Sequence, residues 1–135
     1  MVQVSCAIRD EMLAHAREGR PNEICGLLAG HGSEVTRLFR ARNAEKERPT
    51  VRYEIDPADL LRIFREIDDA KIEHVGIYHS HTHTQAYPSA TDIRLAFYSE
   101  ALYFLVSLMD EQIPSVRAFW IKDGDVTEEQ IEVVG

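Results

Sequence analysis

Residues 74–92 read His-Val-Gly-Ile-Tyr-His-Ser-His-Thr-His-Thr-Gln-Ala-Tyr-Pro-Ser-Ala-Thr-Asp, and this stretch says most about the fold. Residues 74–79 form an apolar run that is typical of a buried strand. A polar loop follows through Pro88. Ser89 to Asp92 then open a helix, which we expect to run to about Ser99. The stretch therefore predicts a sheet strand whose end is connected to a helix by one polar loop.

His79 and His81 lie two residues apart at the end of this strand. Because side chains alternate along a strand, both imidazoles should point to the same face. Two imidazoles on one face are natural zinc ligands, and the loop could bring Asp92 back as a third. Two histidines, one carboxylate and one water would form a catalytic zinc site with an open position. The 2 cysteines of the chain are too few for a cysteine-based zinc site.

Other interpretations of these residues remain open. Ser89 and Asp92 match the Ser/Thr-x-x-Asp/Glu pattern of a helix start, so capping alone would explain their spacing. The two roles can coexist, because a capped helix start would hold Asp92 in place. His83 extends the alternation, but we expect the chain to have left strand geometry there and do not assign it as a ligand. Three further histidines are interpreted as structural or exposed: His15, His31 and His74.

Glu23 precedes an apolar run, Ile24 to Leu28. A carboxylate is unfavourable in such surroundings unless it is paired or used in chemistry. A zinc hydrolase needs a proton-transfer group beside its water, so Glu23 is the candidate base. A surface carboxylate at a strand edge is the alternative, because the spacing does not place Glu23 near His79. Cys25 suggests a nucleophile or redox switch, but we interpret it as a small packing residue.

The rest of the chain mixes short strands and helices without strict alternation. Strands are expected over residues 2–8, 23–29, 34–41, 53–55, 102–109, 115–122 and 131–134. Helices are expected over residues 9–18 and from Asp56-Pro57 onward, where a capping residue precedes a proline. Asp123-Gly124 predicts a turn. This order predicts an α/β or α+β domain with a largely antiparallel or mixed sheet flanked by helices.

Composition narrows the classes of function. The 135 residues amount to one domain, 1–135, with 44% hydrophobic and 28% charged residues. A net charge of −8 argues against nucleic acid as a partner. No apolar run approaches the roughly 20 residues of a membrane helix, and the N-terminus lacks the pattern of a signal peptide. We therefore expect a cytoplasmic protein with reduced cysteines and no membrane partner.

Although the net charge of the chain is negative, one stretch of it is rich in basic residues. We interpret it as a solvated strand and loop, and a docking patch for an acidic protein is the alternative. Its members are Arg37, Arg40, Arg42, Lys46, Arg48 and Arg52.

Glu23, the pair in His79-Ser80-His81, and Ser89-x-x-Asp92 together resemble the motif of the JAMM/MPN+ family of zinc metalloproteases (the JAB/MPN family). The resemblance implies an MPN/JAB-like fold, a curved mixed β-sheet flanked by helices. It implies one zinc per chain, bound by His79, His81 and Asp92. It also implies Glu23 as general acid/base and Ser89 as the stabiliser of the oxyanion. The family hydrolyses peptide or isopeptide bonds after the C-terminal glycine of ubiquitin-like proteins.

Five stretches resemble a narrower group, the small bacterial Mec-type enzymes: residues 23–30, 78–82, 86–89, 105–107 and 123–129. That group releases cysteine from the C-terminus of CysO, a ubiquitin-like sulfur carrier. The resemblance implies a small sulfur-carrier protein ending in Gly-Gly as the partner. Two alternatives stay open: a deubiquitinase-like isopeptidase of the same family, and a non-catalytic interaction module stabilised by zinc. The oligomeric state also stays open, a homodimer included.

Overall fold

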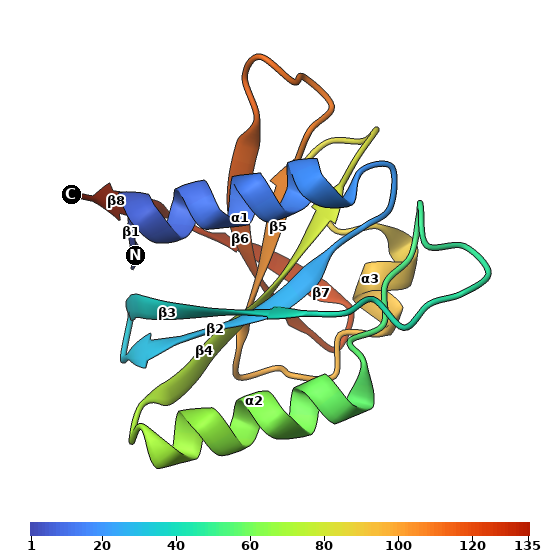
Figure 1. Ribbon diagram of the computed structural model, residues 1–135. Coiled ribbons are helices and arrows are strands. Elements are labelled where there is room, and N and C mark those ends of the chain that lie inside the picture. The colour runs from blue at the N-terminus through green and yellow to red at the C-terminus, as the bar shows by residue number, and fades with distance from the viewer.

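A computed structural model describes all residues 1–135 and contains one eight-stranded sheet with three helices (Figure 1). The strands are β1 (Val2–Ser5), β2 (Cys25–His31), β3 (Glu34–Ala41), β4 (Glu73–His81), β5 (Leu102–Ser107), β6 (Ser115–Lys122), β7 (Asp125–Glu129) and β8 (Ile131–Val134). The helices are α1 (Cys6–Gly19), α2 (Pro57–Asp69) and α3 (Ala90–Arg94). The strand order is β7-β6-β5-β4-β2-β3-β1-β8, with parallel and antiparallel pairs, so the predicted mixed sheet is confirmed.

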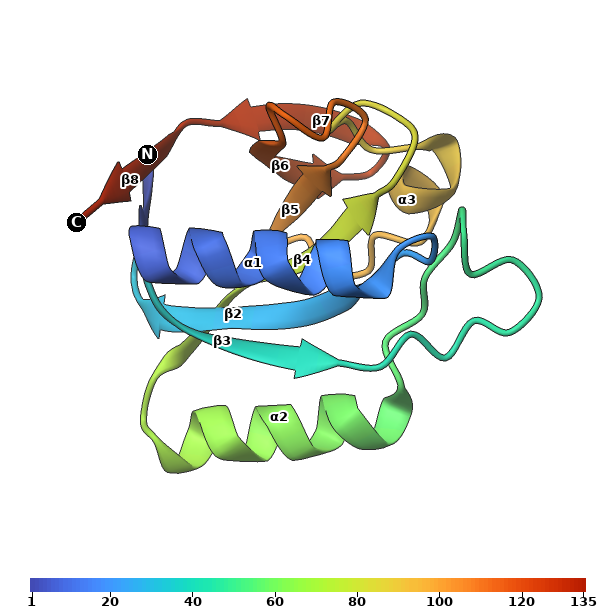
Figure 2. The ribbon, with the colours of Figure 1, turned by 45° about the horizontal axis from the view of Figure 1, so that its top comes forward.

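The sheet is strongly curved. Its two edge strands, β7 and β8, are consecutive in the chain and are separated only by Gln130. The Gln130 carbonyl accepts a hydrogen bond of 2.9 Å from the amide of Val2, beside the β1–β8 pairing. One chain segment, residues 125–134, therefore runs from one edge of the curled sheet to the other (Figure 2).

Two helices cover opposite faces of the sheet (Figures 1 and 2). Met12 and Leu13 of α1 pack in one apolar cluster with Tyr78 of β4. Ile63 of α2 packs in a second cluster with Ile77, the neighbour of Tyr78. The alternation of side chains along β4 thus separates the two cores, and continuing it places the side chain of His79 on the α2 side.

Strand β7 was not predicted, the strands predicted over residues 23–29 and 102–109 are β2 and β5 with bounds shifted by about two residues, and three further elements differ more. The strand predicted over residues 2–8 ends at Ser5, because the Ser5 hydroxyl accepts a hydrogen bond from the amide of Ile8 and caps α1. The strand predicted over residues 53–55 was wrong, since only an isolated bridge joins Ile55 to Asn43. The helix predicted to reach Ser99 ends at Arg94. Beyond it the Tyr98 amide donates to the Tyr103 hydroxyl, which draws the chain toward β5.

The predicted turn at Asp123-Gly124 is confirmed. Both residues have positive φ, 51° and 83°, as a two-residue hairpin loop between β6 and β7 requires.

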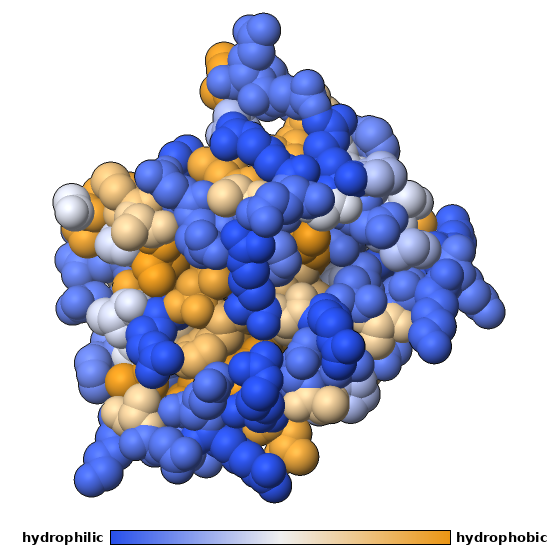
Figure 3. Space-filling view, in the orientation of Figure 1, coloured by the Kyte–Doolittle hydropathy of each residue, from blue (hydrophilic) through white to orange (hydrophobic).

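Hydrophilic side chains cover much of the face that carries α1, with hydrophobic ones interspersed among them (Figure 3). None of the helices combines the length and the apolar character that a membrane crossing requires.

Candidate metal centre

The end of β4 and the start of α3 bring three ligand-type side chains together. The Nε2 atoms of His79 and His81 lie 3.1 Å and 3.0 Å from Oδ2 of Asp92. The three ligand atoms all lie within 4.8 Å of one another. Both histidines are buried, with 1% and 4% of their surface exposed. The structure therefore brings together the three side chains that the sequence predicted to be metal ligands.

The hydrogen bonding of His81 indicates that this cluster needs a proton or a metal ion between His81 and Asp92. Its Nδ1 lies 2.9 Å from the Gln85 carbonyl oxygen, which can only accept, so Nδ1 carries a proton. In the neutral ring, the lone pair of Nε2 then faces an oxygen of the Asp92 carboxylate, another acceptor. Two acceptors at this distance repel each other unless a proton or a metal ion lies with them. The donor set of two imidazoles and one carboxylate is one that zinc accepts, with a fourth position open.

The charges of the cluster agree with this description. Burial alone would raise the pKa of Asp92, but His79, His81 and the amide of Ser89 hold the pKa of that carboxyl well below its usual range. Burial lowers the pKa of His79. It acts in the same direction on His81, but the contacts with Asp92 and Gln85 leave the pKa of His81 raised. The cluster thus combines an anionic oxygen with at least one neutral imidazole.

Ser89 and Asp92 form a capping box at the start of α3. The Asp92 amide donates to Oγ of Ser89 over 3.0 Å, and the Ser89 amide donates to Oδ2 of Asp92 over 2.9 Å. The same Oδ2 atom faces both histidines, so capping orients the carboxylate toward them. The Ser89 hydroxyl accepts in this box and keeps its own proton to donate. The capping interpretation is therefore confirmed, and the capped helix start also directs Asp92 toward the two histidines.

Glu23 comes to the centre through strand register. Cys25 pairs with His79, and the Ser80 amide donates to the Ile24 carbonyl, which places Glu23 opposite His81 in the register. Glu23 is 5% exposed, and its Oε1 atom is buried without a hydrogen-bond partner. Burial raises the pKa of Glu23 to about 8, although the nearby His81 opposes this. Glu23 is therefore a buried carboxyl that can exchange a proton near neutral pH, and not a surface residue.

The structure also separates the remaining candidates. His83 is exposed and lies outside the three-residue cluster. Cys25 is fully buried, and burial raises the pKa of its thiol to about 12. A thiol held in its protonated form is a poor nucleophile, which favours the packing role for Cys25.

Sequence reasoning missed Tyr53. Its ring stacks on the imidazole of His79, with centroids 4.2 Å apart and an angle of 21° between the planes. Tyr53 also lines a cavity of about 400 Å³ that reaches Asp92 and includes Tyr98 and Tyr103 in its wall. No pattern in the sequence indicated this position, because Tyr53 belongs to an irregular loop that only the tertiary structure places.

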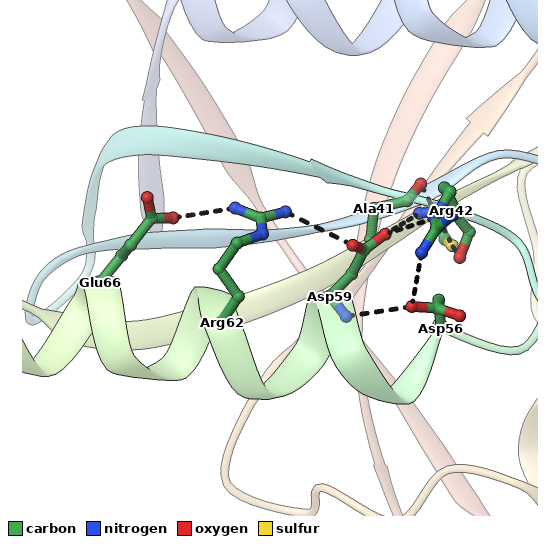
Figure 4. Close-up of polar contacts among 7 residues, drawn as sticks. Ala41, Arg42, Asp56, Asp59, Arg62 and Glu66 are labelled. Atoms are coloured by element: carbon green, nitrogen blue, oxygen red, sulfur yellow. Dashed lines mark hydrogen bonds and ion pairs between the residues drawn. The ribbon is translucent and has the colours of Figure 1, made fainter.

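Two arginines of the basic run, Arg40 and Arg42, are already paired with carboxylates within the chain. Arg40 pairs with Glu11 and Glu18 of α1. Arg42 pairs with Asp56 and Asp59 at the start of α2 (Figure 4). Because helix carboxylates on two faces already hold these guanidinium groups, the structure favours a solvated strand and loop over a single docking patch.

Comparison with known proteins identifies the family. Residues 6–122 match the family described as prokaryotic homologs of the JAB domain. The chain is 46% identical over 125 residues to the CysO-cysteine peptidase of Mycobacterium tuberculosis, covering 91% of this chain and 84% of that one. It is 40% identical over 105 residues to the desampylase of Haloferax volcanii, covering 73% and 75% of the two chains.

A solved structure supports the same assignment. The solution structure of a protein from Desulfitobacterium hafniense superposes with a TM-score of 0.90 at 36% identity, covering 99% of this chain and 93% of that one. A JAB1/MPN domain protein from Archaeoglobus fulgidus shares the fold, with a TM-score of 0.66 at 20% identity over 100% of this chain and 98% of that one. The chain therefore belongs to the JAB/MPN family of JAMM proteins, in its prokaryotic branch.

Proposed function

We propose that this protein is a zinc-dependent peptidase that hydrolyses the bond after the C-terminal glycine of a ubiquitin-like sulfur-carrier protein and releases a single amino acid, cysteine. The observation that carries the proposal is the convergence of His79, His81 and Asp92 beside the buried carboxyl of Glu23. Residues 1–135 would act as one metalloprotease domain with one metal ion. Its compartment would be the cytoplasm, in keeping with the free thiols of Cys6 and Cys25.

His79, His81 and Asp92 would hold the zinc ion, which when bound lowers the pKa of water and polarises a carbonyl group. Glu23 acts as general acid/base: its carboxylate takes a proton from the attacking water and returns it to the departing amine. A carboxyl whose pKa lies near 8 can both hold and release a proton near neutral pH. The absence of a hydrogen-bond partner at Oε1 leaves that oxygen available for the transfer.

Ser89 would stabilise the oxyanion. Its Oγ accepts from the Asp92 amide, so the hydroxyl proton is free to point away from α3 and toward the negative charge that develops on the carbonyl oxygen. The capping box holds Oγ in position before substrate arrives, so the donor needs no reorganisation during the reaction.

The acyl part of the substrate would lie along the cavity that reaches Asp92. Its wall is largely apolar and aromatic, with Tyr53, Tyr98 and Tyr103 among its residues. An extended glycine tail is narrow enough to enter such a site, whereas a folded domain is not. The carrier body would therefore remain outside and present only its C-terminal residues.

The names of the relatives support two leaving groups. The 46% identical relative is a CysO-cysteine peptidase, which favours release of one cysteine. The 40% identical desampylase favours a second candidate function, cleavage of a ubiquitin-like protein from a larger conjugate. The single-residue product is our first candidate because the relative with the higher identity also covers more of the chain.

The test offers zinc-loaded protein two substrates with the same carrier. One carries a C-terminal cysteine after Gly-Gly, and the other is joined through Gly-Gly to a lysine of a second protein. Mass spectrometry should show loss of one cysteine residue from the first carrier, much faster than cleavage of the second. Efficient cleavage of the conjugate alone would replace the first candidate by the second. Cleavage of neither, with the metal site full, would contradict the peptidase assignment.

A further inference from the structure

The backbone of Glu23 is held by a loop and not by a strand. Glu23 precedes β2, where the regular ladder begins at Cys25. Its amide donates to the Pro49 carbonyl over 2.7 Å, and its carbonyl accepts from Nδ2 of Asn43 over 3.0 Å. Both partners belong to residues 43–55, which connect β3 to α2 and are called the β3–α2 loop below. Because Oε1 of Glu23 has no hydrogen-bond partner, these backbone contacts are the polar contacts that fix the point from which its side chain extends.

The side chain of Asn43 makes four hydrogen bonds that connect this loop internally and to Glu23. Its Nδ2 donates to the carbonyls of Glu23 and Arg52, both over 3.0 Å. Its Oδ1 accepts from the amides of Glu45, over 2.9 Å, and Glu54, over 3.1 Å. A side-chain amide has two donor hydrogens and two acceptor lone pairs, so its hydrogen-bonding capacity is full. No other side chain of the loop joins it to Glu23.

Two of the four bonds also connect Asn43 to a metal ligand through Tyr53. Arg52 and Glu54, which bond to Asn43, are the two chain neighbours of Tyr53. The ring of Tyr53 stacks on the imidazole of His79. Figures 1 and 2 show the β3–α2 loop at the same end of the molecule as α3. One side chain therefore connects the loop to Glu23 on one side and to the ring that packs on His79 on the other.

We propose that Asn43 is a positioning residue that sets the placement of Glu23 for proton transfer. The inference rests on the proposed function, because it takes Glu23 as the acid/base. Asn43 touches neither substrate nor metal, and its effect on hydrolysis passes through Glu23. Small displacements of a catalytic group have large effects on rate, so loss of this contact should lower turnover more than substrate binding.

The first test compares Asn43→Ala with the parent protein, both loaded with zinc. We expect kcat to fall about 10-fold with little change in KM, as for a misplaced catalytic group. Ser5→Ala is the matched control, because it removes a helix cap far from the site and also lowers stability. Both variants are assayed at the same number of degrees below their own melting temperatures. If kcat of Asn43→Ala then falls no more than kcat of Ser5→Ala, the loss is one of stability and the proposal is wrong.

The second test is a double-mutant cycle with Glu23→Gln. If Asn43 acts through Glu23, Asn43→Ala should change the residual rate of Glu23→Gln by less than about twofold. An equal loss in both backgrounds would overturn the inference and leave Glu23 as the base. Normal turnover of zinc-loaded Glu23→Gln would instead overturn the assignment of the base, and the inference with it.

Hydrogen exchange provides a readout that does not depend on activity. In the protein without metal, Asn43→Ala should speed exchange of the Glu23 amide at least about 10-fold, because its loop partner is no longer held. The amide of Leu27, inside β2, should keep its protection. Unchanged protection at Glu23 would contradict the proposal. Should Asn43→Ala fail to fold, Asn43→Asp carries the same comparison, because it keeps the acceptor for Glu45 and Glu54 and replaces the donor to Glu23 and Arg52 by an oxygen that repels both carbonyls.

Discussion

Tyr78 and His79 are neighbours on β4 whose side chains lie on opposite faces of the sheet. Tyr78 contacts His15, and His79 contacts His81. On the α1 side, Nδ1 of His15 lies 2.7 Å from the Tyr78 hydroxyl. On the α2 side, His79 and His81 both direct Nε2 at one carboxylate oxygen of Asp92. The hydroxyl can donate or accept, so it satisfies a neutral ring, whereas the carboxylate only accepts. His15 is therefore satisfied as folded, whereas His81, whose Nδ1 already donates to Gln85, faces the carboxylate with a lone pair and needs a proton or a metal ion there.

The two environments also differ in what surrounds them. Burial, together with the charge of Arg40, lowers the pKa of His15 to about 4, so this ring is neutral at physiological pH. On the other face, the raised pKa of Glu23 places a titratable carboxyl beside the ligand pair. Burial alone therefore does not distinguish a metal ligand from a structural histidine; the chemistry of the atom that the ring nitrogen faces does.

The largest effect should come from exchanging His81 for alanine. His81→Ala removes one of three ligands, so we expect the zinc site to be empty and hydrolysis to be abolished. His15→Ala is the matched variant on the opposite face and should keep one zinc per chain. Metal analysis after dialysis measures both. Full zinc in His81→Ala, or loss of zinc in His15→Ala, would break the distinction between the two faces.

Glu23→Gln should separate metal binding from chemistry. The amide keeps the size of the side chain but can no longer accept and return a proton. We expect zinc content to be unchanged and turnover to fall by at least about 10²-fold, a usual general-base contribution. Glu11→Gln, a carboxylate on the α1 side that contacts Arg40, should leave turnover unchanged. Near-normal turnover of zinc-loaded Glu23→Gln would assign the base to another residue.

Ser89→Ala should affect both rate and stability. Loss of an oxyanion donor should lower kcat on the order of 10²-fold, and loss of the cap should cost about 1 kcal/mol of stability. Ser5→Ala removes the corresponding cap of α1 and should show the stability loss without the rate loss. Thermal unfolding and turnover must therefore be measured on both variants. Equal rates in the two would limit Ser89 to capping.

The last prediction concerns acid stability on the α1 side, where neither activity nor metal binding should change. Unfolded His15 takes up a proton near pH 6.5, but in the folded chain its pKa is about 4. The unfolded state therefore binds more protons between these values, and the stability that neutral His15 contributes is lost as the pH falls through this window. In His15→Gln this loss should be absent. The difference in melting temperature between parent and variant should shrink from pH 7.5 to pH 4, and a constant difference would contradict the neutral state of His15.

Much of the candidate site follows from local sequence, and the reason is geometric. His79 and His81 share a face because strands alternate, and Ser89 orients Asp92 because a capping box has fixed spacing. Glu23 lies 56 residues before His79 in the sequence, so only the pairing of β2 with β4 brings it near. The acid/base role of Glu23 was therefore predicted from the resemblance to the family motif, and not from the spacing of residues in the sequence.

The residues that support the site could not be predicted in this way. Tyr53 and Asn43 lie in a loop without regular structure, where no periodicity fixes the direction of a side chain. Their contacts with His79 and Glu23 depend on how the loop folds back on the sheet. The length of α3 was overestimated for a related reason: the helix ends at Arg94, and the contact of Tyr98 with Tyr103 beyond it has no local signal in the sequence.

The most direct test of the central claim is anomalous X-ray diffraction at the zinc absorption edge, on crystals grown with one equivalent of zinc. We expect a single peak per chain, at roughly 2.0–2.2 Å from Nε2 of His79, Nε2 of His81 and a carboxylate oxygen of Asp92. A peak at any other residues, or no peak in a protein that hydrolyses its substrate, would contradict it.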